Sequence, residues 1–161
     1  MCEYCGCRGV PPIAELMDEH TALVDQATLV RNDLGTGDHA AAMARRTDLV
    51  SRLERHVRRE EDGIFRAMRT AREFLDEIDA LEGEHRDFAV AISTLDPGSP
   101  DFAARVTSLL DDLQVHVERE DLGIFLVSVV TLGATGWAIV DEAHTRAPSF
   151  LLDHATRVSP A

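Results

Sequence analysis

The chain has 161 residues, of which 45% are hydrophobic, and its formal net charge at pH 7 is -13. This length and composition suit one domain with a core of its own. Only 5% of the residues are aromatic and no alternating strand pattern stands out, so helices are favoured. The acidic excess argues against nucleic acid and anionic membrane surfaces as partners, because both attract basic patches. We therefore expect small-molecule partners, and the sequence leaves the oligomeric state open.

The start of the chain and its most apolar stretch bear on location. The chain begins MCEYC and lacks the apolar run of a secretory signal, which predicts a cytoplasmic protein. The nearly uncharged stretch 122–140 is long enough to span a membrane, but Gly123, Gly133 and Gly136 interrupt it. We interpret it as a buried helix end and turn. All 16 basic residues are arginine, a usage typical of GC-rich coding sequences and hence of a bacterial source.

All three cysteines, Cys2, Cys5 and Cys7, lie within the first seven residues. Three thiols at this spacing suit a metal-binding knuckle or a redox cluster, and a tail with ordinary thiols or a labile disulfide fits equally well. Three thiolates leave tetrahedral zinc one ligand short, and His144 or His154 near the C-terminus would complete a Cys3His site. The sequence therefore offers a candidate zinc site that joins the two ends of the chain.

Glycine and proline breaks predict an all-α domain. They divide the chain into four long helices, at about 12–33, 38–69, 71–95 and 100–132, and one or two short helices within 137–157, broken by Pro148. Asp38 and Ser99 are the expected caps of the second and fourth helices, with Pro100 in the first turn. The predicted parts are a Cys-rich segment over 1–11, a helical bundle over 12–132, and short helices over 133–161 that pack on the bundle.

The block H-V-x-R-E-[ED]-x-G-I-F occurs twice in the chain, at residues 56–65 and 116–125. Residues four apart in an α-helix lie about 40° apart around its axis. His56 with Glu60, and His116 with Glu120, therefore each present an imidazole and a carboxylate on one helix face.

A further histidine precedes each copy of the block. His20 follows two acidic residues upstream of the first copy, and His85 follows the sequence EGE upstream of the second. The unit "His, then His-x-x-x-Glu" thus occurs twice, once in each half of the chain.

The repeated histidines and glutamates stand where core residues are expected. The heptad-like stripes of the four helices are Ile13, Leu16, His20, Leu23, Ala27, Val30; Leu49, Leu53, His56, Glu60, Ile64, Ala67; Phe74, Ile78, Leu81, His85, Phe88, Ile92, Leu95; and Phe102, Val106, Leu109, Leu113, His116, Glu120, Ile124, Val127. A lone histidine on an apolar face is most often a hydrogen-bonded core residue. Four of them with two carboxylates need a cation, because burying an unpaired charge costs several kcal/mol.

Imidazole and carboxylate ligands in a helical bundle suit iron, manganese or zinc, and the twofold pattern indicates two ions. If both glutamates bridge, each ion receives two imidazoles. An oxide or hydroxide bridge would add a fifth donor and leave one position of each octahedral ion open for a small ligand.

The order His, His-x-x-x-Glu, His, His-x-x-x-Glu on successive helices resembles the hemerythrin-like (HHE cation-binding) family over roughly residues 12–130. This resemblance implies an up-down-up-down four-helix bundle around a non-haem di-iron centre with an oxo or hydroxo bridge. The iron ligands that it implies are His20, His56, Glu60, His85, His116 and Glu120.

Two positions depart from the pattern of the oxygen-carrying members. They have a second histidine one turn after that of the third helix, where this chain has Ala89. They also take the last carboxylate five residues after the fourth-helix histidine, which here is Asp121. We prefer Glu120, because it lies about 40° from His116 whereas Asp121 lies about 140° away. Glu61 and Asp121 are candidates for orienting an imidazole.

The resemblance implies several functions. Bacterial relatives include proteins linked to peroxide, nitric oxide and oxygen handling, and a eukaryotic F-box relative senses iron and oxygen. A missing imidazole leaves a more open iron, which favours reaction over reversible oxygen carriage. Our preferred hypothesis is hydrogen peroxide decomposition of the catalase or peroxidase kind, in oxidative stress. The alternatives are a module that binds or senses oxygen, nitric oxide or iron without turnover, and a bundle with a purely structural metal.

Overall fold

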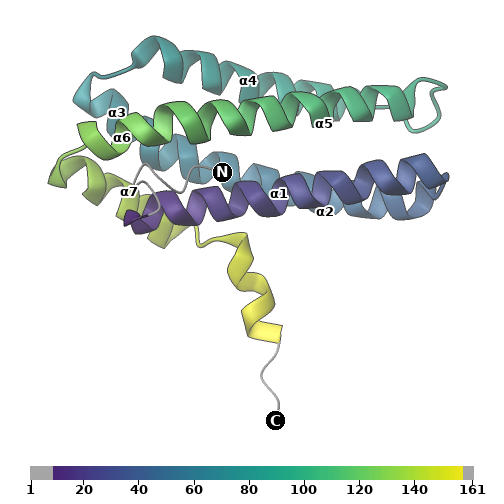
Figure 1. Ribbon diagram of the computed structural model, residues 1–161, viewed down its shortest axis with the longest axis horizontal. Coiled ribbons are helices and arrows are strands. Elements are labelled where there is room, and N and C mark those ends of the chain that lie inside the picture. Colours follow the sequence, from purple (N-terminus) through teal and green to yellow (C-terminus); the bar gives the residue numbers. More distant parts are fainter. Residues whose placement is uncertain (1–8, 158–161) are drawn as a thin grey trace.

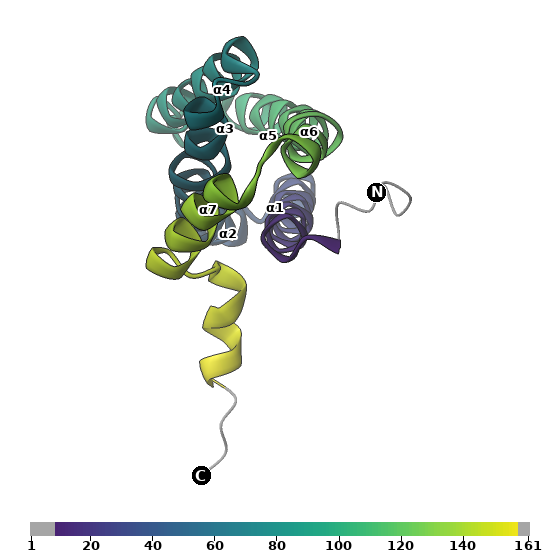
Figure 2. The ribbon, with the colours of Figure 1, turned by 90° about the vertical axis from the view of Figure 1, so that its left-hand side faces the viewer.

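The computed structural model describes residues 9–157, and within them the side chains of residues 9–153. Four long helices lie side by side in alternating directions (Figure 1): α1 (Pro11–Thr36), α2 (His39–Glu60), α4 (Leu75–Ser93) and α5 (Phe102–Arg119). Viewed from the end, they occupy the four corners of a bundle (Figure 2). No β-strand occurs within residues 9–157, and the predicted all-α fold class is confirmed.

Helices α2 and α5 both continue through a π-helical turn, where uniform α-helix was predicted. The turns are η2 (Glu61–Phe65) and η3 (Glu120–Ile124), followed by α3 (Arg66–Ala71) and α6 (Phe125–Thr131). The N–H groups of Arg66 and Phe125 each donate to a carbonyl five residues back. Each turn therefore holds one more residue than an α-helical turn, at the place where the repeated block supplies its glutamate.

The first two helix ends follow the local sequence. Gly37, at a φ of 77°, ends α1, and the Asp38 side chain accepts a hydrogen bond from the Ala41 N–H at 3.0 Å. Asp38 is thus the helix cap that the sequence predicted.

Two other boundaries differ from the prediction. Arg72 and Phe74 have φ values of 61° and 53°, so the chain turns there and α4 begins only at Leu75. Phe74 is therefore 46% exposed and does not join the core stripe. Helix α5 begins at Phe102 rather than at Pro100, because the Phe102 N–H closes a turn onto the Ser99 carbonyl at 3.1 Å.

The C-terminal part adds α7 (Ala134–Arg146) and a 3-10 helix, η4 (Phe150–Arg157), with Pro148 between them. Helix α7 crosses the end of the bundle at which the π-helical turns lie, and it packs against η2, α3 and α1 (Figure 2). None of the helices in the described range is both long and apolar enough to cross a membrane.

Two apolar clusters fill the bundle. One contains Leu16, Phe65 and Ile124 and lies toward α7, and the other contains Leu23, Leu53 and Leu113 and lies toward the opposite end. His20 falls between Leu16 and Leu23 on α1, so the polar positions lie between the two clusters. The sequence stripe thus places a polar layer inside an otherwise apolar core.

Candidate metal centre

The structure brings all six predicted ligands together in the bundle interior, and none is more than 6% exposed. They come from every long helix: His20 from α1, His56 and Glu60 from α2, His85 from α4, His116 from α5, and Glu120 from the start of η3. Below, His20 and His56 are called the first pair, and His85 and His116 the second pair.

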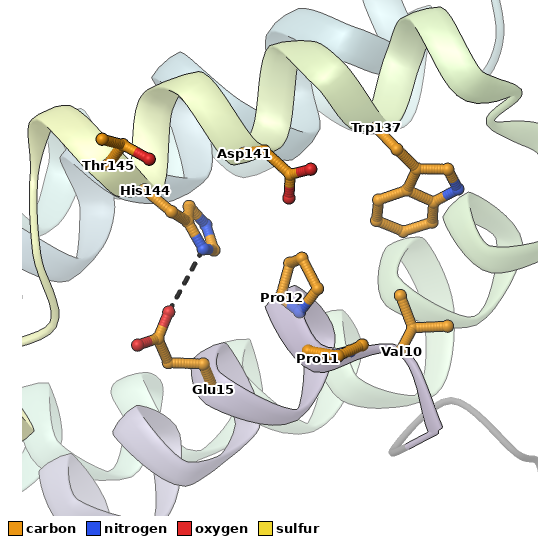
Figure 3. Close-up of a pocket in the computed structure, with 8 residues that line it drawn as sticks. All are labelled: Val10, Pro11, Pro12, Glu15, Trp137, Asp141, His144 and Thr145. Carbon is orange, nitrogen blue, oxygen red and sulfur yellow. Dashed lines mark ion pairs between the residues drawn. The ribbon is translucent and has the colours of Figure 1, made fainter.

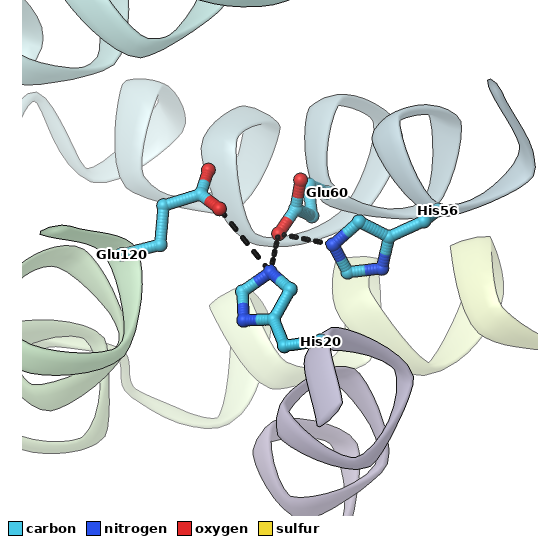
Figure 4. A group of neighbouring side chains, drawn as sticks. All are labelled: His20, His56, Glu60 and Glu120. Carbon is cyan, nitrogen blue, oxygen red and sulfur yellow. Dashed lines mark ion pairs between the residues drawn. The ribbon is translucent and has the colours of Figure 1, made fainter. Parts of the chain in front are cut away.

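The first pair contacts both glutamates (Figure 4). His20 Nε2 lies 3.3 Å from Glu60 Oε1 and 3.2 Å from Glu120 Oε2. His56 Nε2 lies 3.0 Å from the same Glu60 oxygen. Ligand atoms of these four residues all lie within 4.8 Å of one another, a spacing at which they could hold one metal ion.

The second pair faces the other oxygens of the same two glutamates. His85 Nε2 lies 3.5 Å from Glu60 Oε2 and 3.7 Å from Glu120 Oε1. His116 Nε2 lies 3.3 Å from Glu120 Oε1 and 3.0 Å from His85 Nε2. Each glutamate therefore directs one oxygen to each pair, which is the arrangement of two cation positions that share both carboxylates.

Several of these polar atoms lack a hydrogen-bond partner. Nε2 of His20 and His56 and all four oxygens of Glu60 and Glu120 are buried without one, among the residues that the structure describes. An unsatisfied buried polar group costs about 1–3 kcal/mol, and more when it is charged. Cations between the two pairs would satisfy all six atoms, and the nitrogen and oxygen donors suit iron, manganese or zinc.

Every imidazole contacts an outer carboxylate through its second nitrogen, Nδ1. The pairs are His20 with Asp121 at 2.8 Å, His56 with Glu19 at 2.7 Å, His85 with Glu61 at 2.9 Å, and His116 with Glu84 at 2.7 Å. A carboxylate at Nδ1 keeps a proton on that nitrogen and fixes the plane of the ring. The Nε2 lone pair is then free to bind a cation.

Sequence reasoning found two of these outer carboxylates and missed two. Glu61 and Asp121 contact His85 and His20, consistent with the predicted role of orienting an imidazole. Glu120 and Asp121 both approach His20 because the π-helical turn begins at Glu120. Glu19 and Glu84 were missed, although each directly precedes a repeated histidine, and that equivalence was the available signal.

Without a cation, the charges within the cluster shift the pKa values of its own imidazole and carboxyl groups. Burial alone would lower the pKa of His85, but the carboxylates of Glu120, Glu61 and Glu60 around the ring raise it to about 10. Burial and the charge of Glu120 would raise the pKa of Glu60, yet His56 and His20 lower it to about 2. The centre therefore favours positive charge at the imidazoles, which protons supply when no metal ion does.

Phenyl rings close the centre on several sides. Phe125 stacks on His20 with centroids 5.4 Å apart, Phe65 stacks on His85 at 5.7 Å, and Phe88 meets His116 edge-on at 5.2 Å. Phe65 and Phe125 are the last residues of the two repeated blocks. These rings keep water from the imidazoles and strengthen the electrostatic interactions inside.

An arginine from each block supports one outer carboxylate. Arg59 lies 3.2 Å from Glu19, and its guanidinium also contacts Glu15 and donates to the Ala147 carbonyl at 2.6 Å. Arg59 is 1% exposed, and it also donates to His144 Nδ1 of α7 at 3.0 Å. The first pair is thus connected through Glu19 and Arg59 to the C-terminal helix.

Arg119 has the equivalent place in the second block. It contacts Glu84 and forms two hydrogen bonds with Glu77, at 2.7 and 3.0 Å. The Arg119 side chain is 37% exposed, and that of Glu84 is 35% exposed. The outer layer of the second pair is therefore open to solvent.

The candidate zinc site is described only in part. Cys2, Cys5 and Cys7 lie outside the described residues, and the side chain of His154 is likewise not described. His144 lines an open pocket between the start of α1 and α7, where its Nδ1 lies 3.2 Å from Glu15 (Figure 3). Burial and the charge of Arg59 lower the pKa of His144, which favours the neutral ring.

Comparison with known proteins agrees with this geometry. The hemerythrin HHE cation binding domain matches residues 11–126, a stretch that contains all six predicted ligands. No curated protein and no solved structure gives a significant match. The domain match spans most of the chain and ends just after the second repeated block. The chain therefore belongs to the hemerythrin family of HHE cation-binding domains.

Proposed function

We propose that this chain is a non-haem di-iron protein that decomposes hydrogen peroxide in a catalase- or peroxidase-like reaction. The observation that carries the proposal is the shared carboxylate pair: Glu60 and Glu120 each turn one buried oxygen toward the first imidazole pair and the other oxygen toward the second. Four residues gather at the first position, and three gather at the second, where Glu60 also lies 3.5 Å from His85. Imidazole and carboxylate donors meet at both positions, so we expect both to hold the same kind of ion.

The first ion would be held by His20 and His56, the second by His85 and His116, and both by the two glutamates. Four protein donors leave an octahedral ion room for a bridging oxygen and a small exchangeable ligand. An iron pair, when bound, supplies an acceptor and donor of two electrons. The outer carboxylates at Nδ1 keep the imidazole nitrogens directed at the ions, and the phenyl rings keep bulk water away.

The proposed reaction balances without help from an acidic side chain. One peroxide is oxidised to dioxygen and gives up two electrons and two protons, and a second peroxide takes them up and becomes two waters. The protein therefore has to position the two peroxides and stabilise the charge that the transferred electrons and protons create. It supplies no net proton.

The test is dioxygen release on addition of peroxide to protein with a measured iron content. We expect rapid release from the iron-loaded chain and none from a Glu120→Ala variant that has lost its metal. An Ala89→His variant, with a further imidazole one turn after His85, should release dioxygen more slowly. A stable, reversible oxygen complex with peroxide left untouched would replace this function by binding or sensing.

Binding or sensing of oxygen or nitric oxide is the second candidate function. The observation that favours it is an apolar pocket lined by His85, Phe88 and Ala89, which suits an uncharged gas better than a polar oxidant. Nitric oxide or oxygen titrations of the reduced protein, followed by optical spectra, would measure it directly. Tight binding without peroxide turnover would make it the primary function.

We also propose that Cys2, Cys5 and Cys7 bind zinc together with His144. The pocket places His144 beside the first residues of α1, directly after the segment that carries the cysteines. Zinc content should fall when residues 1–8 are removed, with the iron content unchanged, and equal zinc in both proteins would refute the site.

A further inference from the structure

A pocket between α2 and α4 runs from the surface to His85 of the second imidazole pair. Its volume is about 200 Å³. Its floor is formed by the buried side chains of Leu53, His85 and Phe88, while Glu54, Ala89 and Ser93 at its mouth are exposed. His85 is also 3.0 Å from His116 through its Nε2. The pocket thus brings the surface to within one side chain of the proposed second ion.

The walls of this pocket are mostly apolar. Val50, Leu53, Phe88 and Ile92 line both the pocket and a second, smaller hollow of about 30 Å³ that continues along the bundle. Apolar walls offer water few hydrogen bonds, so apolar guests enter them readily, as xenon and benzene enter dry cavities in other proteins. A polar solute would lose hydrogen bonds to water on entering.

A groove on the other side of α4 is more polar. It lies between α4 and α5, and charged and polar side chains line it together with apolar ones: Glu84, Asp87, Asp112, His116 and Arg119, with Phe88, Ala91, Leu109 and Val115. Water and other hydrogen-bonding solutes find partners there. The second pair therefore has a mainly apolar hollow at His85 and a more polar groove at His116.

We propose that the pocket between α2 and α4 binds an uncharged diatomic gas, dioxygen or nitric oxide, and conducts it between solvent and the second imidazole pair. The inference rests on the proposed function in that dioxygen is the product of peroxide decomposition and the ligand of the alternative. Ala89 determines access, because its small side chain at the mouth leaves the way to His85 open.

The first experiment needs neither iron nor turnover. Xenon, an apolar probe of similar size, is bound to the purified protein and located by xenon NMR or in xenon-pressurised crystals. We expect xenon beside Leu53 and Phe88 in the unaltered chain and its loss in Ala89→Phe. Val90→Phe is the matched control, because Val90 is 61% exposed and lines none of the three hollows. Xenon retained in Ala89→Phe, or absent from the unaltered chain, would overturn the proposal.

The second experiment measures gas access to the loaded centre. Association of nitric oxide with the reduced iron protein, followed by stopped-flow spectroscopy, should be slowed in Ala89→Phe and unchanged in Val90→Phe. Melting temperatures of the three proteins check that the exposed substitutions leave the fold intact. Equal rates in all three would refute the route. If the rates differ and peroxide is not decomposed, the route stands and only the proposed reaction fails.

Discussion

The two imidazole pairs have the same inner chemistry and different surroundings. Each pair has two Nε2 atoms facing shared glutamates, two carboxylates at Nδ1, and an arginine behind one of them. Around the first pair, Glu19 and Arg59 are no more than 1% exposed, because α7 lies over them. Around the second pair, Glu84 and Arg119 meet solvent. The internal repeat thus determines the ligands and their partners, and the cover by the C-terminal helix is one feature that makes the halves unequal.

Loss of a shared glutamate should have the largest effect, because it disturbs both halves. Glu120→Ala should reduce the metal content from about two ions per chain to a small fraction. It should lower the free energy of unfolding by about 3–5 kcal/mol, the usual cost of breaking a buried charged pair. Metal analysis and urea titration measure the two effects. The exposed Glu118→Ala is the control, and a Glu120→Ala protein with full metal would contradict the assignment of ligands.

The two arginines provide the clearest test of the difference between the halves. Arg59→Met should cost about 3–5 kcal/mol of unfolding free energy, because it leaves Glu19 and Glu15 facing each other without their cation. Arg119→Met should cost about 0–1 kcal/mol, since water can replace an exposed ion pair. Urea unfolding of both variants under the same conditions measures this. Equal losses would mean that the cover by α7 is not what distinguishes the halves.

The outer carboxylates should show the same inequality in metal affinity. Glu19→Gln should weaken metal binding by about 10- to 100-fold, because a neutral amide replaces the negative carboxylate that faces the Nδ1 atom of His56. Glu84→Gln should have a smaller effect, since the Glu84 side chain is 35% exposed and solvent already screens its charge. Competition with a chelator, in which the loss of each metal ion is measured separately, compares the metal affinities of the two variants. A larger loss in Glu84→Gln would reverse the proposed order.

The glycines of the repeated block give the smallest effects. A Cβ at Gly63 would lie 3.6 Å from Ala143 of α7, whereas no described atom outside the turn lies within 4 Å of a Cβ at Gly123. Gly63→Leu should therefore push α7 away and cost about 1–3 kcal/mol, as overpacking does. Gly123→Leu should change stability by about 0.5 kcal/mol or less. Thermal unfolding of both variants tests this, and comparable losses would show that α7 is not packed tightly at Gly63.

The sequence predicted the fold class and the clustering of the six residues, because periodicity and repetition are local signals. The helical period alone predicts that Leu53, His56 and Glu60 lie on one buried face of their helix, and all three are buried. The contact of Glu19 with His56 depends on how α1 packs on α2, and no spacing within one helix reveals it. A turn was predicted near residue 70, but its position at Arg72 and Phe74 was not, because a positive φ at an ordinary residue has no glycine or proline to mark it.

The π-helical turns were also not predicted from the sequence. With uniform α-geometry, Glu120 and Asp121 point in different directions, and only one of them can serve the centre. In the structure, Glu120 faces the imidazole Nε2 atoms while Asp121 contacts His20 at Nδ1. The wider turn lets consecutive residues serve the same histidine from two sides. Nothing in the block except its glycine marks a departure from α-geometry.

The position of α7 has a consequence for how metal ions bind and leave. If the proposed centre holds two ions, the ion at His20 and His56 would lie behind the contacts of Arg59 with His144 and the Ala147 carbonyl, so we expect its release to require local opening of the C-terminal helix. The ion at His85 and His116 would have the more exposed partners Glu84 and Arg119. We therefore expect the two ions to exchange at unequal rates, so that partial loading favours one of the two one-ion forms. Sequential addition of two different metals would then give a mixed centre of defined arrangement.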